Sequence, residues 1–201
     1  MTVPAAAHAS KRSMFMTVVL LVAGLLVVAI GAVLAYAATK PDTFRVQRSA
    51  SINAPPETIF PFLNDLRNFA RWSPYEEKDP DMKRAYGGAE SGKGATYEWD
   101  GDRNVGKGRI EIADTSPPTK VVLRLDMTKP FAAHNTVEFT LEPKGGATTV
   151  TWAMNGHTPY IAKVVHVFLD VDRMVGRDFE AGLAKLKTIA ELARLKSALG
   201  Q

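Results

Sequence analysis

The hydrophobic pattern begins with an unbroken apolar segment near the N-terminus. No charged residue occurs between Arg12 and Lys40, and residues 14–38 are almost all Val, Leu, Ala, Ile, Gly or Met. A helix needs about 20 apolar residues to cross about 30 Å of hydrocarbon, and a longer one can tilt. We therefore predict a transmembrane helix at residues 14–38. Tyr36 falls where an interfacial aromatic side chain is expected.

The charges that flank this segment predict its orientation. Lys11 and Arg12 lie just before it, whereas Lys40 is the only basic residue that closely follows it. Because cytoplasmic flanks carry the excess of Lys and Arg, residues 1–13 are predicted to form a cytoplasmic tail. Residues 39–42 then form a linker. Everything after them is predicted to lie on the periplasmic, extracytoplasmic side of a bacterial inner membrane, which makes the protein single-pass.

A cleaved signal peptide is the alternative interpretation of the same segment. Ala35-Tyr36-Ala37 has the small-x-small pattern of a cleavage site, and the region before the segment is basic. A signal sequence usually has an apolar core of about 7–15 residues, which is much shorter than residues 14–38. An uncleaved anchor is therefore favoured. The rest of the chain is exported under either interpretation.

After the linker, apolar and polar residues alternate in short segments. Such alternation is typical of half-buried strands, and Gly and Pro residues between the segments are typical of an antiparallel meander. Proline at a helix start, followed by helically spaced apolar residues, indicates two short helices after the first strand. The predicted strands are residues 43–52, 83–86, 95–100, 105–113, 120–127, 134–142 and 148–155.

The last predicted element is a long amphipathic helix. Thr158 and Pro159 suit its cap and its first position. Apolar residues from 161 to 193 then recur at steps of three and four, with charged residues on the opposite side. This pattern predicts one helix of about 35 residues, kinked at Gly176.

This order of elements predicts an α+β fold at residues 43–196, followed by a short tail at residues 197–201. Six or seven antiparallel strands with one apolar face must bury that face, and only the C-terminal helix is long enough to cover it. A strongly curved sheet around one helix leaves a gap between them. Gaps of this kind are typical sites for small molecules.

Six stretches of the soluble part have a recognisable residue pattern. They are Arg48-Ser-Ala-Ser-Ile-Asn-Ala-Pro-Pro56, Asn64-Asp-Leu-Arg-Asn68, Trp72-Ser-Pro74, Val105-Gly-Lys-Gly108, Thr149-Val-Thr-Trp152, and Met174-Val-Gly176 with Asp178-Phe-Glu-Ala-Gly-Leu183. They resemble the START-like, or helix-grip, superfamily, also called SRPBCC, and within it a bacterial branch labelled polyketide cyclase/dehydrase. The resemblance covers residues 43 to about 192.

The resemblance implies a helix-grip fold, and members of this branch commonly begin with one membrane helix. It does not imply a single activity. The superfamily places enzymes, lipid carriers, hormone receptors and chaperone cofactors on one scaffold.

Composition removes several other classes of function. The net charge is +4, but no dense basic cluster with interleaved aromatic residues occurs, which argues against nucleic acid as a partner. The chain has no cysteine, so disulfides, thiolate zinc sites and a cysteine nucleophile are excluded. The four histidines lack the spacing of a metal site, and no nucleotide-binding motif is present. We predict neither a metal nor a cofactor.

The side chains expected to line the gap come from the inward faces of the strands and from the long helix. Asp172 lies beside the apolar stripe, where a carboxylate facing a cavity would act as an acid or base, or bind a ligand hydroxyl. An ion pair with Arg48 is favoured instead, because a buried charge without a partner is costly. The predicted cavity residues are Tyr97, Trp99, Leu125, Met127, Phe139, Trp152, Met154, Phe168 and Asp172.

Three functions remain open. The preferred one is a membrane-tethered, non-catalytic domain that binds an apolar small molecule or lipid. The second is an enzyme, a cyclase or dehydratase for a polyketide-like substrate, with Asp172, His157 or Tyr97 as acid or base. The third is a scaffold or sensory subunit of an envelope complex, with a filled interior and no ligand.

Overall fold

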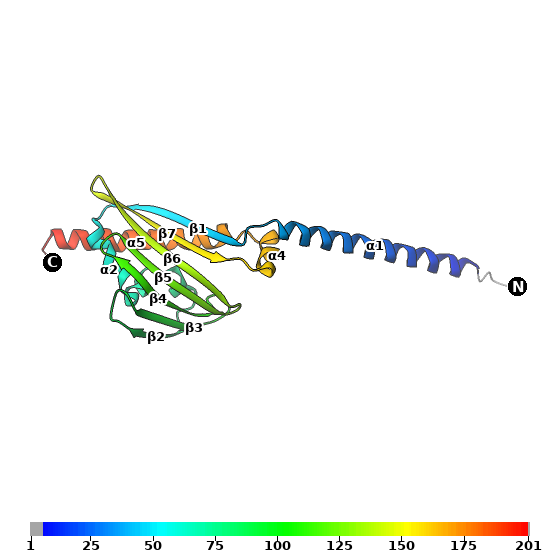
Figure 1. Cartoon of the computed structure of the whole chain (residues 1–201), viewed down its shortest axis with the longest axis horizontal. Coiled ribbons are helices and arrows are strands. Elements are labelled where there is room, and N and C mark those ends of the chain that lie inside the picture. The colour runs from blue at the N-terminus through cyan, green and yellow to red at the C-terminus, as the bar shows by residue number, and fades with distance from the viewer. Residues whose placement is uncertain (1–5, 201) are drawn as a thin grey trace. The chain divides into compact units, whose positions relative to one another are not determined.

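The computed structural model describes residues 6–200, and their side chains from residue 14 onward. The chain divides into two compact units (Figure 1). The first comprises Met1–Asp42 and Pro159–Leu169, and the second comprises Thr43–Thr158 and Asp170–Gln201. Of the predicted cytoplasmic tail, residues 1–5 lie outside the described part, and a helix already begins at Ala6.

The first unit contains two helices, α1 (Ala6–Ala38) and α4 (Tyr160–Phe168). The predicted apolar segment is a continuous part of α1, and its 25 residues, Met14–Ala38, are long and apolar enough to cross a membrane. Almost all of its side chains are exposed, because no other element covers them. Short α4 packs against α1 although more than a hundred residues separate them in the sequence.

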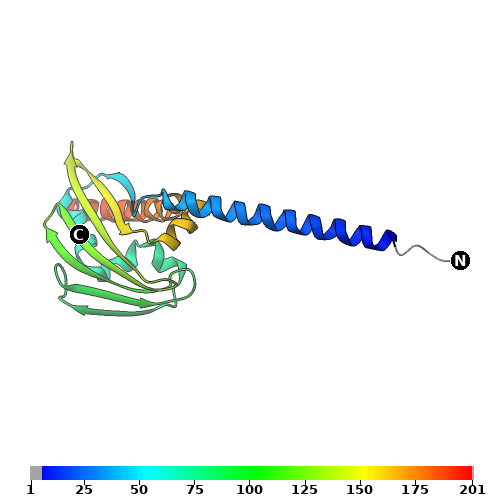
Figure 2. The ribbon, with the colours of Figure 1, turned by 45° about the vertical axis from the view of Figure 1, so that its right-hand side comes forward.

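The second unit is built on one antiparallel sheet of seven strands in the order β1-β7-β6-β5-β4-β3-β2. All seven predicted strands are present, with ends that differ by a few residues. The sheet is strongly curved, as Figures 1 and 2 show. The strands are β1 (Thr43–Ile52), β2 (Lys83–Gly88), β3 (Ala95–Asp100), β4 (Lys107–Ser116), β5 (Lys120–Lys129), β6 (Ala133–Lys144) and β7 (Ala147–His157).

Three short helices follow β1, namely α2 (Pro56–Asn64), the 3₁₀ helix η1 (Leu66–Arg71) and α3 (Pro74–Lys78). Prolines occupy the first positions of α2 and α3, where the missing backbone N–H costs nothing. Trp72, between η1 and α3, is 1% exposed, and its Nε1 donates to the carbonyl of Phe62 at 2.9 Å. Its ring edge meets Trp152 of β7 at 5.4 Å between centroids. This contact fixes the short helices against the inner face of the sheet.

The long C-terminal helix α5 (Val171–Ala198) packs along β1 and closes the core. Its buried stripe includes Phe179, Leu183 and Leu186, each at most 1% exposed. The prediction of an α+β helix-grip fold is therefore confirmed. Burying a Leu or Phe side chain of this kind contributes about 1.5–3 kcal/mol.

The prediction of a single helix from residue 159 onward is wrong. Leu169 has an extended backbone (φ −116°, ψ 126°), which ends α4. Asp170 then starts a new helix, since its carboxylate accepts a hydrogen bond from the backbone N–H of Arg173 at 2.9 Å. The periodicity of apolar residues continues across the break, so the pattern alone does not reveal it. Gly176 lies within α5 at a close approach, where a Cβ would come within 1.9 Å of Nη2 of Arg48.

Candidate ligand cavity

A cavity of about 450 Å³ lies inside the second unit, between the curved sheet, the short helices and the first turns of α5. Most of its wall is apolar and aromatic, and all three tryptophans of the chain line it. Among the lining residues, Lys78, Arg103, Asn104, Pro130 and Met174 are exposed, so the cavity opens to solvent where they lie.

Seven of the nine predicted cavity residues line this space. They are Tyr97, Trp99, Leu125, Met127, Phe139, Trp152 and Met154. All of them sit on inward-facing positions of strands β3, β5, β6 and β7, where the alternation of apolar residues is clear. The sheet side of the cavity is thus readable from sequence periodicity.

The other two predicted cavity residues lie elsewhere. Phe168 is 70% exposed at the end of α4, in the first unit, because the helix breaks immediately after it. Asp172 is exposed in the first turn of α5 and does not contribute to the lining. Its two carboxylate oxygens accept from Nη1 and Nη2 of Arg48 at 3.1 and 3.0 Å.

The Arg48 guanidinium is shared by two acids. Its Nε also donates to Glu180, about two turns further along α5, at 2.8 Å. The hydrogen bonds from Arg48 lower the pKa of Asp172; desolvation of the carboxylate partly opposes this shift, and the positive charge of Arg48 adds to it. Asp172 is therefore ionised at neutral pH. It forms an ion pair with Arg48, which joins β1 to α5.

The remaining candidate acid–base residues do not converge. His157 is exposed at the end of β7 and is not among the lining residues. Tyr97 lines the cavity, but its hydroxyl donates to Oε1 of Glu76 at 2.6 Å, and Arg84 donates to the other oxygen of that carboxylate at 2.8 Å. Burial, together with the hydrogen bond to Glu76 and its charge, raises the pKa of Tyr97. The Tyr97 hydroxyl is thus neutral and already engaged.

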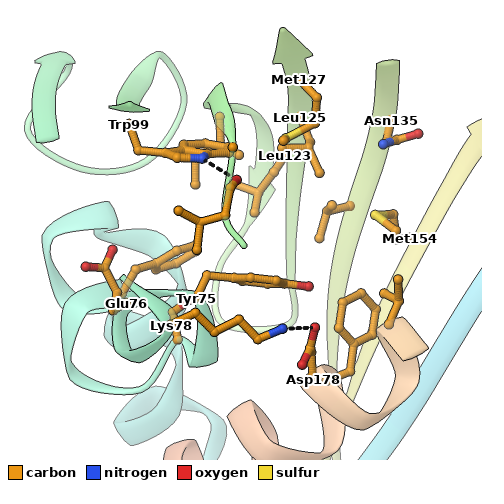
Figure 3. Close-up of a pocket in the computed structure, with 18 of the residues that line it drawn as sticks. Tyr75, Glu76, Lys78, Trp99, Leu123, Leu125, Met127, Asn135, Met154 and Asp178 are labelled. Atoms are coloured by element: carbon orange, nitrogen blue, oxygen red, sulfur yellow. Dashed lines mark hydrogen bonds and ion pairs between the residues drawn. The ribbon is translucent and has the colours of Figure 1, made fainter. Parts of the chain in front are cut away.

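The sequence reasoning missed the side of the cavity formed by α3. Tyr75 extends its ring into the middle of the space, as Figure 3 shows. Burial, and to a lesser extent the charge of Asp178, raises the pKa of Tyr75. Among the described residues, none forms a hydrogen bond with its hydroxyl. At five residues, α3 is too short to show a hydrophobic period. The only sequence signal for it is the proline that follows Trp72 and Ser73, which suits a helix start.

Two further polar features belong to the wall. Lys78 of α3 and Asp178 of α5 form an ion pair of 2.6 Å beside Tyr75 (Figure 3), which bridges the two helices. Nε1 of Trp152 is buried and finds no hydrogen-bond partner in the described part of the chain. The opposite edge of that indole faces α5, since its Cζ3 lies 2.8 Å from the position of a Cβ on Gly182. Tyr75 therefore retains an unused hydroxyl donor in a mostly apolar cavity, whereas the Trp152 N–H is buried within the wall.

The position of Trp99 depends on a glycine in the neighbouring strand. A Cβ at Gly108 of β4 would lie 2.6 Å from Cζ2 of Trp99, so only glycine allows the indole to pack flat there. Nε1 of Trp99 donates to the carbonyl of Val105 at 3.1 Å, also visible in Figure 3. This glycine and this hydrogen bond hold the indole as a wall of the cavity.

The sequence matches one protein family across almost the whole second unit. The family is described as polyketide cyclase / dehydrase and lipid transport, and its model matches residues 43–191. The chain belongs to this family. Its members are related by a fold that holds hydrophobic ligands, which agrees with the apolar cavity described above. No curated protein matches the sequence.

Solved structures confirm the fold. The crystal structure of protein CV1439 from Chromobacterium violaceum is 15% identical, with 76% of this chain and 99% of that chain covered and a TM-score of 0.53. The Aha1 dimer from Colwellia psychrerythraea is 18% identical, with 75% and 98% covered and a TM-score of 0.52. Ara h 8.0201 is 9% identical, with 74% and 97% covered and a TM-score of 0.51. At these identities the likeness concerns the fold alone.

Proposed function

We propose that the protein is a membrane-tethered, non-catalytic binding domain for an apolar small molecule or lipid. The observation that carries this proposal is the open, mostly apolar cavity of about 450 Å³ between the sheet and α5. Ligand sites are typically about 300–1,000 Å³, apolar, and supplied with a few polar groups that orient the ligand. A scaffold with a filled interior would have no such space.

The polar groups of the cavity favour binding over catalysis. A catalytic acid or base must reach the reacting group and have a pKa suited to proton transfer near neutral pH. Asp172 is held ionised outside the cavity by Arg48, and the hydroxyl of Tyr97 is held neutral against Glu76. The hydroxyl of Tyr75 reaches into the cavity, and its raised pKa keeps it protonated at neutral pH, so that it can donate a hydrogen bond. Such a group can recognise a ligand acceptor without transforming it.

The tether follows from α1. Its apolar length suits a bilayer, and the basic residues before it support the proposal that the domain lies on the extracytoplasmic side of a bacterial inner membrane. Only residues 39–42 separate the end of α1 from β1, which at about 3.5 Å per residue keeps the domain within a short reach of lipid. A domain held there can take up or release an apolar molecule without a long passage through water.

A test uses the fact that all three tryptophans line the cavity. The full chain, kept soluble in amphipol, is titrated with a brominated fatty acid, a heavy-atom quencher of tryptophan fluorescence. We expect saturable quenching. The cavity-filling variant Leu125→Phe/Val137→Phe should lose it, whereas the matched variant Leu192→Phe/Leu195→Phe, at exposed positions of α5, should retain it.

Equal quenching in both variants would show that the probe binds elsewhere and would refute the proposal. Native mass spectrometry of the unfilled protein adds an independent readout, since a co-purified small molecule should be lost from the filled variant alone. Turnover of such a molecule during incubation would instead favour the enzyme alternative.

A further inference from the structure

Helix α4 presents an apolar stripe that no other part of the described chain covers. Ile161, Val165 and Phe168 follow one another at steps of four and three residues, so they share one face of the helix. They are 75%, 43% and 70% exposed, and Leu169 just beyond the helix is 53% exposed. Large apolar residues gathered on one side of a short helix indicate a surface that is covered by something else.

The opposite face of α4 is fixed to α1 by polar contacts. Lys163 is 7% exposed, and its ammonium donates to the carboxylate of Asp42, just beyond the end of α1. The hydroxyl of Tyr160 donates to the backbone carbonyl of Leu34 at 2.8 Å. Leu34 lies before the end of the apolar segment and Asp42 lies after it, so the two contacts fix the level at which α4 meets α1.

That level is the outer boundary of the apolar segment. Leu34 lies four residues before the last apolar residue, Ala38, which is about 6 Å along the helix axis. Tyr36 and Lys40 lie at the same level, and the Lys40 ammonium sits 4.6 Å from the centre of the Tyr36 ring. Tyrosine and lysine at the end of a membrane helix are typical of the headgroup region.

We propose that α4 is an interfacial membrane helix, lying in the outer headgroup layer of the bilayer that α1 crosses, with Ile161, Val165 and Phe168 toward the acyl chains. This inference rests on the membrane tether proposed above. The occupant of the apolar stripe is lipid, because the stripe is fixed to the end of a helix whose own apolar surface requires lipid. A helix of this kind typically inserts about 5–10 Å into the boundary between headgroups and acyl chains. The chain would thus contact the bilayer through two segments, residues 14–38 and residues 160–169.

The absence of cysteine makes a depth measurement straightforward. Single variants Ile161→Cys and Phe168→Cys of the full chain are labelled with NBD and reconstituted into vesicles of phosphatidylcholine and phosphatidylglycerol. Ile30→Cys, within the apolar run, is the control for insertion, and Arg177→Cys, exposed on α5, is the control for water. Nitroxide lipids that carry the quencher either near the headgroup or near the acyl-chain end then report the depth of each label.

We expect the two α4 labels to be quenched strongly by the shallow nitroxide and weakly by the deep one. The Ile30 label should show the reverse order, and the Arg177 label little quenching by either. A label at Val165→Cys should lose its shallow quenching when Ile161→Ser and Phe168→Ser are added, because the stripe then no longer holds the helix in the interface.

The other outcomes separate this inference from the proposed tether. Quenching at Ile30 without quenching at α4 would overturn the interfacial helix and leave the tether in place. No quenching at Ile30 would refute the tether, and with it the interfacial helix. Blue-shifted emission from α4 labels that lipid nitroxides do not quench would show that protein, such as a second copy of the chain, covers the stripe, which would also overturn the inference.

Discussion

The indole of Trp152 lies flat on the ring of Phe179, with centroids 4.0 Å apart and planes 9° from parallel. The first residue belongs to β7 and the second to α5, so this stacked pair joins the sheet to the helix. Both rings also line the cavity. The same contact therefore supports the fold and forms part of the binding wall.

Removing one ring should cost much of the stability of the second unit. Phe179→Ala is expected to lower the free energy of unfolding by about 3–5 kcal/mol, because a large buried ring is lost and the space it leaves refills only partly. Denaturant unfolding of the full chain in amphipol, followed by far-UV circular dichroism, measures the change. Leu192→Ala, at an exposed position of the same helix, should stay within about 0.5 kcal/mol. Equal effects of the two variants would contradict the role of the stacked pair.

The ion pair between Arg48 and Asp172 predicts a pH dependence. The pKa of Asp172 is lowered in the folded state, so its contribution to stability is present above the unfolded pKa of about 3.9 and is lost as the pH falls through the folded pKa. Asp172→Asn should therefore lower the midpoint of thermal unfolding at pH 7. The difference from the wild type should shrink steadily below about pH 4. A difference that stays constant down to about pH 2 would show that the carboxylate charge is not its cause.

Tyr75 should select ligands that carry a hydrogen-bond acceptor. Tyr75→Phe removes the hydroxyl at the centre of the cavity and leaves the ring in place. Binding of a brominated long-chain methyl ester should weaken about two- to twelvefold, the range of a single net hydrogen bond. Binding of a bromoalkane of the same length, which has no acceptor, should not change. Equal losses for both probes would point to a packing defect and contradict a polar role.

Two of the five tyrosines should stay protonated in alkaline solution. Burial raises the pKa of both Tyr75 and Tyr97, and Tyr97 also donates to Glu76. Between about pH 9 and pH 11, around the usual tyrosine pKa of about 10, the absorbance change of the native protein should therefore equal that of Tyr75→Phe/Tyr97→Phe. A clearly smaller absorbance change in the double variant would mean that these two hydroxyls titrate within this range and would contradict the prediction.

The sequence determined the order and kind of almost all the elements. Periods of two and of three to four residues are local properties, so the seven strands, the apolar helix and the long C-terminal helix can be read from neighbouring residues. The same alternation places Trp99, Leu125 and Met154 on the inner face of the sheet. The resemblance to START-like proteins led to the same architecture.

Only the tertiary structure decided what the local pattern leaves open. The apolar period runs through Leu169 without interruption, and it is the cap at Asp170 that divides the helix and leaves Phe168 exposed on α4. The position of Tyr75 at the centre of the cavity and the pairing of Asp172 with Arg48 depend on residues far apart in the chain. Whether a curved sheet and a helix pack solidly or enclose a space depends on the sum of many side-chain volumes in three dimensions, and no local period carries that information.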